Sequence, residues 1–224
     1  MRIIDTPQYG PMFRFTDANV YWALYILSDG KRMGRKKLAE EIGVGEGSMR
    51  RILETLRQWE MITIKQTGIT ITRNGLGFLA EIPIKVVDLD MGDSIVGDYS
   101  QSIVVYGVGK KIENGMQQRD AGIKAGATGC TTLVIRDGVL MIPPDWNMDK
   151  ERPEIAARIR ERTNLTEDDA IIVGSAYDQH TAVVAALTAA FELFVPPTNS
   201  TRSCSLANAL SCSTRFATDR QMVS

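Results

Sequence analysis

A short stretch centred on a glycine constrains the fold of this chain more than any other feature. Between residues 34 and 56, apolar side chains recur at helical spacing on both sides of Gly43: Leu38, Ala39, Ile42, Val44, Met49 and Leu53. Glycine tolerates the left-handed backbone that ends a helix. The pattern therefore predicts two short helices joined by a tight turn at Gly43-Val44 and crossing closely at Ala39.

The sequence around this pair predicts three further elements. Thr16-Asp17 can cap a helix over residues 17–27, and the second helix of the pair should run over residues 46–60. Two alternating runs, residues 62–65 and 69–72, flank the turn Gln66-Thr67-Gly68 and predict a hairpin. A small helix should follow from Thr72 to Leu79. Three helices followed by a hairpin make a winged helix-turn-helix.

The second helix of such a pair lies in the major groove of DNA with its N-terminal turn at the base edges. Arg50 and Arg51 face away from the apolar stripe, and the guanidinium fork matches guanine O6 and N7. Glu46 could accept a hydrogen bond from cytosine N4 or could weaken binding near phosphates. Lys65 and Gln66 of the hairpin could reach phosphate or the minor groove. We therefore predict nine DNA-contacting residues: Arg35, Lys36, Lys37, Glu46, Ser48, Arg50, Arg51, Lys65 and Gln66.

The distribution of charge supports this interpretation. Residues 31–73 contain ten basic and five acidic residues, a net charge of +5, which leaves −6 for the rest of a chain whose net charge is −1. A basic segment on an acidic body is a local footprint for a polyanion.

Residues 16–81 resemble the winged-helix regulators that are widespread in bacteria and archaea. The matching segments are Leu38-Ala39-Glu40, Ile42-Gly43-Val44, Met49-Arg50-Arg51-Ile52-Leu53, Leu56 and the hairpin at 62–72. The resemblance implies a transcriptional regulator with double-stranded DNA as its partner, and a homodimer, since such regulators commonly bind paired half-sites. Winged helices also serve as protein-interaction modules, so docking onto transcription machinery is an alternative.

Beyond Ile82-Pro83 the pattern changes to alternating strands and helices. Strands are expected over residues 84–89, 102–108, 131–136, 139–142 and 170–174, and helices over residues 113–125, 152–163 and 178–194. Asp137-Gly138 predicts a tight hairpin turn. The fold class is therefore α+β, with a winged helix-turn-helix in residues 1–82 followed by a separate α/β domain in residues 83–195. Residues 196–224 have no apolar period and are expected to be a disordered tail.

The helix expected over residues 113–125 carries a group of polar side chains followed by a glycine-rich turn. We expect this group to bind a small effector: Gln117, Gln118, Arg119, Asp120, Lys124 and Thr128. The alternative is an ordinary ion pair between Asp120 and Lys124, with Gly126 ending the helix. Residues 109–129, 131–138 and 172–176 also look like an archaeal family that pairs a winged helix with a C-terminal domain of uncharacterised function. That resemblance implies a regulator but supplies no ligand.

The sequence contains no motif typical of a catalytic site. The chain has one histidine, His180, and three cysteines without metal-type spacing, and it lacks a phosphate-binding lysine loop and a nucleophile elbow. We expect no cofactor, no metal and no enzymatic activity, with an enzyme fused to a regulatory winged helix as the alternative. Without a signal pattern or a membrane-length apolar stretch, a cytoplasmic location without membrane contact is expected. Cys130 is expected to be a small buried residue, and the aspartates at 88, 90, 93 and 98 a solvated loop.

Overall fold

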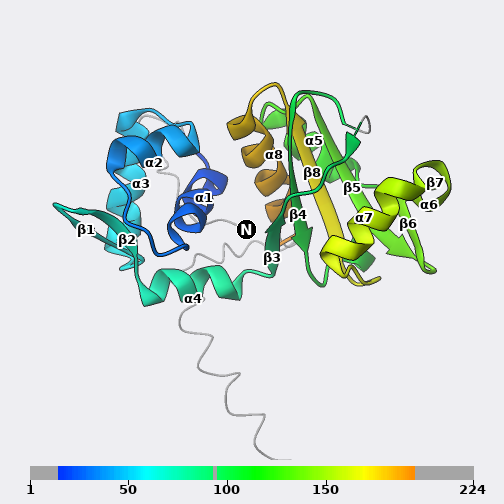
Figure 1. The fold of residues 1–224 in the computed structure, drawn as a ribbon, viewed down its shortest axis with the longest axis horizontal. Helices are drawn as coiled ribbons and strands as arrows, with labels where there is room; N and C mark the ends of the chain where they lie inside the picture. Colours follow the sequence, from blue (N-terminus) through cyan, green and yellow to red (C-terminus); the bar gives the residue numbers. More distant parts are fainter. Residues whose placement is uncertain (1–14, 93–94, 195–224) are drawn as a thin grey trace, which may run out of the picture.

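The computed structural model describes residues 15–92 and 95–194. Residues 1–14 and the tail expected over residues 196–224 lie outside the described residues. The described chain forms two lobes that lie side by side (Figure 1). We call residues 15–82 the N-terminal lobe and residues 83–194, where described, the sheet lobe.

The N-terminal lobe consists of helices and one hairpin. Its elements are α1 (Asp17–Leu27), α2 (Arg35–Ile42), α3 (Glu46–Gln58), β1 (Ile62–Lys65), β2 (Gly68–Ile71) and α4 (Arg73–Glu81). Thr16 begins α1, and its backbone N–H donates to Asn19 Oδ1 at 2.8 Å, so an otherwise unpaired donor is satisfied. Gly43 ends α2 with a φ of 74°, as the sequence predicts. Thr72 begins α4 by accepting from the N–H of Gly75.

The sheet lobe is built on six strands in the order β3-β4-β8-β5-β6-β7, and every neighbouring pair is antiparallel. Its elements are β3 (Ile84–Val87), β4 (Tyr99–Val105), the 3-10 helix η2 (Gly109–Lys111), α5 (Met116–Lys124), β5 (Gly129–Arg136), β6 (Val139–Ile142), β7 (Trp146–Asn147), α6 (Met148–Glu151), α7 (Pro153–Thr163), β8 (Ala170–Ala176) and α8 (Gln179–Glu192). The last strand in the chain, β8, lies between β4 and β5, and all seven of its residues are buried.

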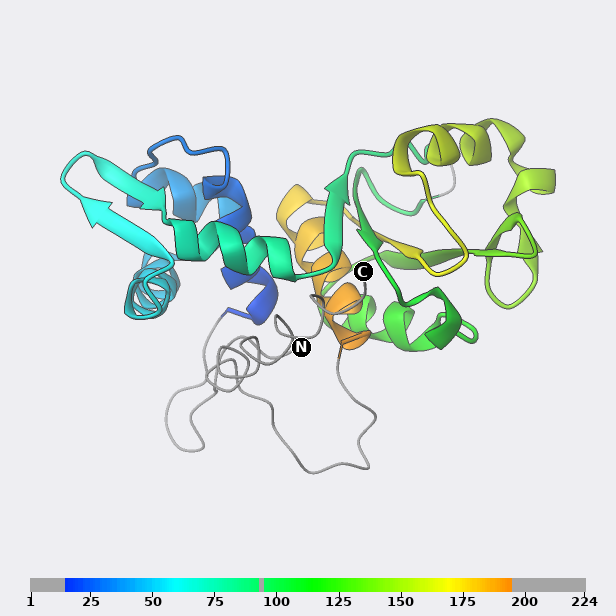
Figure 2. The ribbon, with the colours of Figure 1, turned by 90° about the horizontal axis from the view of Figure 1, so that it is seen from below.

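Helices cover both faces of this sheet. Figure 2 shows α7 on one side and α5 with α8 on the other. The side chains of β8 alternate accordingly, as successive residues of a strand must. Ile172 belongs to the apolar core that includes α8, whereas Ile171 and Val173 belong to the core beneath α7. The sheet therefore separates two cores.

The predicted α+β class is confirmed, and so is the order of the main elements, but several details differ from the sequence-based expectation. The sequence did not predict the direction of the strands, and all neighbouring pairs among the described strands are antiparallel. The strand expected over residues 102–108 is instead β4, which begins at Tyr99, and the helix expected from residue 113 is α5, which begins only at Met116. Gly115, with a φ of 70°, precedes α5 and forces this later start. The short elements η2, β7 and α6 were not predicted.

The two lobes share one apolar core through α8. This core includes Leu24 of α1, Leu38 of α2, Met49 of α3 and Leu187 of α8, each at most 1% exposed. Tyr21 of α1 and Phe191 of α8 meet edge to face, with ring centroids 5.7 Å apart and ring planes at 80°. Burial raises the pKa of Tyr21, with a smaller contribution from Tyr25, so the phenol stays neutral. The lobes are distinct in topology but joined in packing.

Candidate nucleic-acid interface

The turn between α2 and α3 positions α3 on the surface of the N-terminal lobe. The N–H of Gly43 donates to the carbonyl of Ala39 at 3.0 Å and closes α2. Gly45 then begins α3, whose inner face buries Met49, Ile52, Leu53 and Leu56. The opposite face is exposed and includes Arg50, Arg51, Glu54 and Arg57. The predicted phase of this helix is therefore correct.

None of the predicted DNA-contacting residues is buried. Ser48 is half-buried, and the other eight are exposed. They lie on three neighbouring parts of the lobe: the first turn of α2, the N-terminal half of α3 and the tip of the hairpin. The sequence thus placed these side chains on the surface, while contact with DNA stays a prediction.

The start of α2 is unusual in charge. Arg35, Lys36 and Lys37 occupy its first turn, where the helix dipole already presents positive charge. Gly34 begins the helix without a side chain that could accept a hydrogen bond from the first N–H groups. Three cations beside uncapped N–H groups destabilise a helix in isolation and favour an anion such as a backbone phosphate.

The two arginines of α3 differ in their surroundings. Arg51 lies 3.8 Å from Glu54, one turn further along the helix, and both side chains are 58% exposed. An exposed pair at this distance contributes at most about 1 kcal/mol. Arg50 forms no ion pair with the described residues. The sequence did not distinguish the two arginines, and base contact by either stays a prediction.

The hairpin, which we call the wing, is fixed to the start of α2. Met33 pairs with Ile69 of β2 through two backbone hydrogen bonds, at 3.0 and 2.8 Å. Arg32 donates to Thr67 Oγ1 at the wing tip at 3.1 Å. Arg32 therefore belongs to the same basic surface, although the predicted set omitted it. Its place in the basic run before Gly34 was the signal that could have identified it.

The predicted effector group on α5 is only partly assembled. Gln117, Arg119, Asp120 and Lys124 are exposed, but Gln118 is buried, with 5% of its surface exposed. Thr128 is occupied, because its hydroxyl donates to the backbone carbonyls of Val96 and Ser175. Gln118 and Thr128 thus differ from the four exposed members of the group, and ligand binding by the group stays a prediction. The alternative ion pair between Asp120 and Lys124 is also not found among the described residues.

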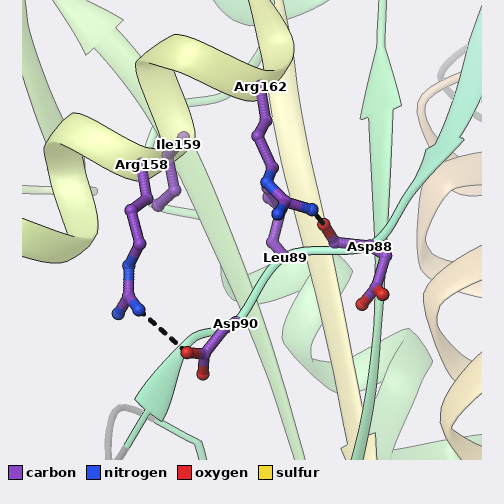
Figure 3. Close-up of a pocket in the computed structure, with 6 residues that line it drawn as sticks. All are labelled: Asp88, Leu89, Asp90, Arg158, Ile159 and Arg162. Carbon is purple, nitrogen blue, oxygen red and sulfur yellow. Dashed lines mark hydrogen bonds and ion pairs between the residues drawn. The ribbon is translucent and has the colours of Figure 1, made fainter.

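A pocket of about 200 Å³ lies elsewhere, between α7 and the segment after β3 (Figure 3). Leu89 and Ile159 form its apolar floor. Its polar groups are paired with each other: Arg158 contacts Asp90 at 2.8 Å, and Arg162 donates to the carbonyl of Asp88 at 3.2 Å. The aspartates expected to be a solvated loop are thus in part anchored to α7.

The described residues offer little for metal or thiol chemistry. No group of three or more metal-ligating side chains occurs in residues 15–92 and 95–194. Cys130 is buried, as predicted, and burial raises the pKa of its thiol to about 12, so the reactive thiolate does not form near neutral pH. Within the same ranges, no helix has both the length and the apolar character needed to cross a membrane.

In comparison with known proteins, the two lobes match different families. Residues 21–84 match the family described as the CggR N-terminal DNA binding domain. Residues 96–193 match a family described as a domain of unknown function, DUF4443. A solved structure of a hypothetical protein from Pyrococcus horikoshii OT3 is similar, with a TM-score of 0.64 and 25% identity, over 80% of this chain and 93% of that one. No functionally curated protein matches. The chain thus pairs a DNA-binding type of N-terminal lobe with a sheet lobe that has no assigned role.

Proposed function

We propose that this protein is a DNA-binding transcriptional regulator that inserts α3 into the major groove. The observation that carries the proposal is the exposed basic surface formed jointly by the first turn of α2, the outer face of α3 and the wing tip. The match of residues 21–84 to a DNA-binding domain family supports it independently. The net charge of +5 over residues 31–73 directs this surface, rather than the acidic remainder, towards DNA.

Each part of the surface has a separate task in this proposal. Arg50 donates in bidentate fashion to guanine O6 and N7 and so reads sequence. The start of α2, with Lys36 exposed beside uncapped N–H groups, binds a backbone phosphate and sets the position of the lobe on the duplex. Lys65 at the wing tip reaches phosphate or the minor groove. Glu46, in the first turn of α3, is placed to accept from cytosine N4 and would then add to specificity.

Substitution of Arg50 tests base reading. Sites selected from a random duplex library by the full chain supply the cognate sequence. Arg50→Ala should then weaken binding by about 1–3 kcal/mol and relax specificity at one base pair. The melting temperature should not change, because the side chain is exposed. Lys150→Ala, an exposed cation on α6, is the matched control and should bind as wild type does. Equal binding by the two variants would contradict the assignment of Arg50.

Substitution of Lys36 tests phosphate binding. Lys36→Ala should weaken binding to all duplexes alike and reduce the slope of log affinity against log salt concentration by about 1. A sequence-dependent loss with an unchanged slope would assign Lys36 to base reading instead.

We further propose that the sheet lobe senses a small ligand or forms the dimer, with Arg119 as the test residue. Arg119 is exposed on α5 beside Gln117 and Asp120. If it binds a ligand, Arg119→Ala remains dimeric and loses the thermal stabilisation by the effector. If it pairs across an interface, the variant is monomeric in light scattering and loses DNA affinity without ligand. A variant that is dimeric, binds DNA normally and responds fully to an effector would exclude both roles.

A further inference from the structure

Four glycines lie against helix α8: Gly43, Gly122, Gly126 and Gly174. On the sheet side, a Cβ built on Gly174 of β8 would lie 2.6 Å from the carbonyl oxygen of Ala182 and 2.7 Å from the N of Ala186. Real Cβ atoms do not approach so closely, so α8 lies directly on the backbone of β8. Because no side-chain atoms separate α8 from β8 at Gly174, the two elements have little room to shift relative to each other.

The contact between α8 and α5 also involves glycines, at longer distances. A Cβ on Gly126, just after α5, would lie 3.3 Å from Thr181 Cγ2. A Cβ on Gly122, within α5, would lie 3.9 Å from the carbonyl oxygen of Ala185 and 2.5 Å from Cys130 Cβ on β5. α5 therefore fits between β5 and α8, and a displacement of α5 must be taken up by α8.

The other side of α8 contacts the helix-turn-helix itself. His180, in the first turn of α8, packs over Gly43 in the α2–α3 turn, and a Cβ on Gly43 would lie 2.5 Å from His180 Cγ. Near the other end of α8, Phe191 is 4% exposed and meets Tyr21, which is 2% exposed. Both ends of α8 thus contact the N-terminal lobe. The contact made by His180 is at Gly43, in the turn that leads into α3.

We propose that α8 is a relay, by which we mean that it transmits a displacement of α5 to α3. In this proposal, His180 is the residue that positions the α2–α3 turn. Chains of tightly packed groups carry coupling between sites when they cannot deform continuously. A ligand or partner that shifts α5 would move α8, and His180 would transmit that shift to Gly43 and so to the start of α3. The consequence for DNA binding rests on the proposed function; the coupling within the protein does not.

Amide hydrogen exchange in residues 43–49 of the full chain tests the His180 contact without DNA. His180→Ala should accelerate exchange there by about fivefold or more, and His180→Phe, which keeps a ring over Gly43, should restore protection. Gln179→Ala, an exposed neighbour on the same helix, is the control and should have no effect. Unchanged exchange in His180→Ala, or failure of His180→Phe to restore it, would overturn the positioning role.

A double-variant cycle tests the relay. Cys130→Ala and Cys130→Val change the packing of α5 on β5 without altering a residue of α8 or of the turn, and at least one should alter exchange in residues 43–49. In the His180→Ala background that effect should disappear, giving a coupling of about fivefold. Additive effects, or no effect of either Cys130 variant on the turn, would overturn the relay. If instead the cycle shows coupling but the protein binds no DNA, the relay stands and the proposed function falls.

Discussion

The shared core between the lobes makes Phe191→Ala the most informative stability variant. Phe191 is 4% exposed and contacts Tyr21 of the other lobe edge to face. Removing a buried Phe side chain costs about 3–5 kcal/mol through lost burial and the cavity that remains. About 0.5–1.5 kcal/mol of this belongs to the aromatic pair itself. A domain with a total stability of about 5–15 kcal/mol would lose a large fraction of it.

Urea unfolding of the full chain, followed by circular dichroism and tryptophan fluorescence, measures this loss. Trp22 and Trp59 report on the N-terminal lobe, and Trp146 reports on the sheet lobe. Wild type should unfold in one transition, whereas Phe191→Ala should unfold its N-terminal lobe at lower urea concentration. Phe191→Leu is the control; it keeps most of the volume and should cost about 1.5 kcal/mol or less. A cost below about 1 kcal/mol for Phe191→Ala would refute the shared core.

Three further predictions concern the sheet lobe. Gly174→Ala should lower the melting temperature by more than 10 °C or prevent folding, because its Cβ would meet the backbone of α8; a shift of a few degrees would contradict the close approach. Asp178 begins α8 and accepts from the N–H of Thr181 at 2.9 Å, and hydrogen bonds from Thr181 lower the pKa of Asp178. Asp178→Ala should therefore cost about 1 kcal/mol at pH 7. The loss of unfolding free energy in Asp178→Ala should be largest at pH values above the ordinary pKa of Asp. It should become smaller as the pH falls through the lowered pKa that Asp178 has in the folded protein. In chemical denaturation, the stability of Asp178→Asn should not show this pH dependence. Cys130, in a chain with Cys204→Ser and Cys212→Ser, should react with a maleimide only after unfolding; rapid reaction of the folded protein would contradict its burial.

The parts of the fold that the sequence predicted are those determined within a few residues. Thr16 and Thr72 begin helices by bonding to groups three residues away, and Gly43 ends one through its own backbone conformation. Asp137-Gly138, with φ angles of 50° and 76°, turns the β5–β6 hairpin by itself. Such signals need no knowledge of the rest of the chain.

The parts that could not be predicted depend on partners far away in the chain. β8 lies between β4 and β5, and both of these strands precede it in the chain by more than thirty residues. The apolar pattern of a strand does not specify partners at such a separation. Gln118 was assigned to the ligand group because it lies beside the face that carries Gln117, Asp120 and Lys124, but the packing of β5 and α8 against α5 decides which residues of this helix are buried. The contact between His180 and Gly43 could not be predicted either, because the two residues are far apart in the sequence.

The shared core also changes how DNA binding must be tested. A fragment of residues 1–82 would contain all nine predicted DNA-contacting residues, but α8 completes the core around α1 in this structure. Truncation at residue 82 would expose Tyr21 and its neighbours, and a negative result with the fragment would then reflect its instability. DNA binding is therefore best measured on the full chain.

The most direct test of the central claim is the affinity of the full chain for duplex DNA as a function of salt. The account predicts binding to sites selected from a random library, with log affinity falling linearly with log salt concentration. Combined replacement of Lys36 and Arg50 by alanine should weaken that binding sharply, whereas replacement of Lys150 should not. Absence of duplex binding by the folded full chain at low salt, or binding that both sets of variants retain, would contradict the account.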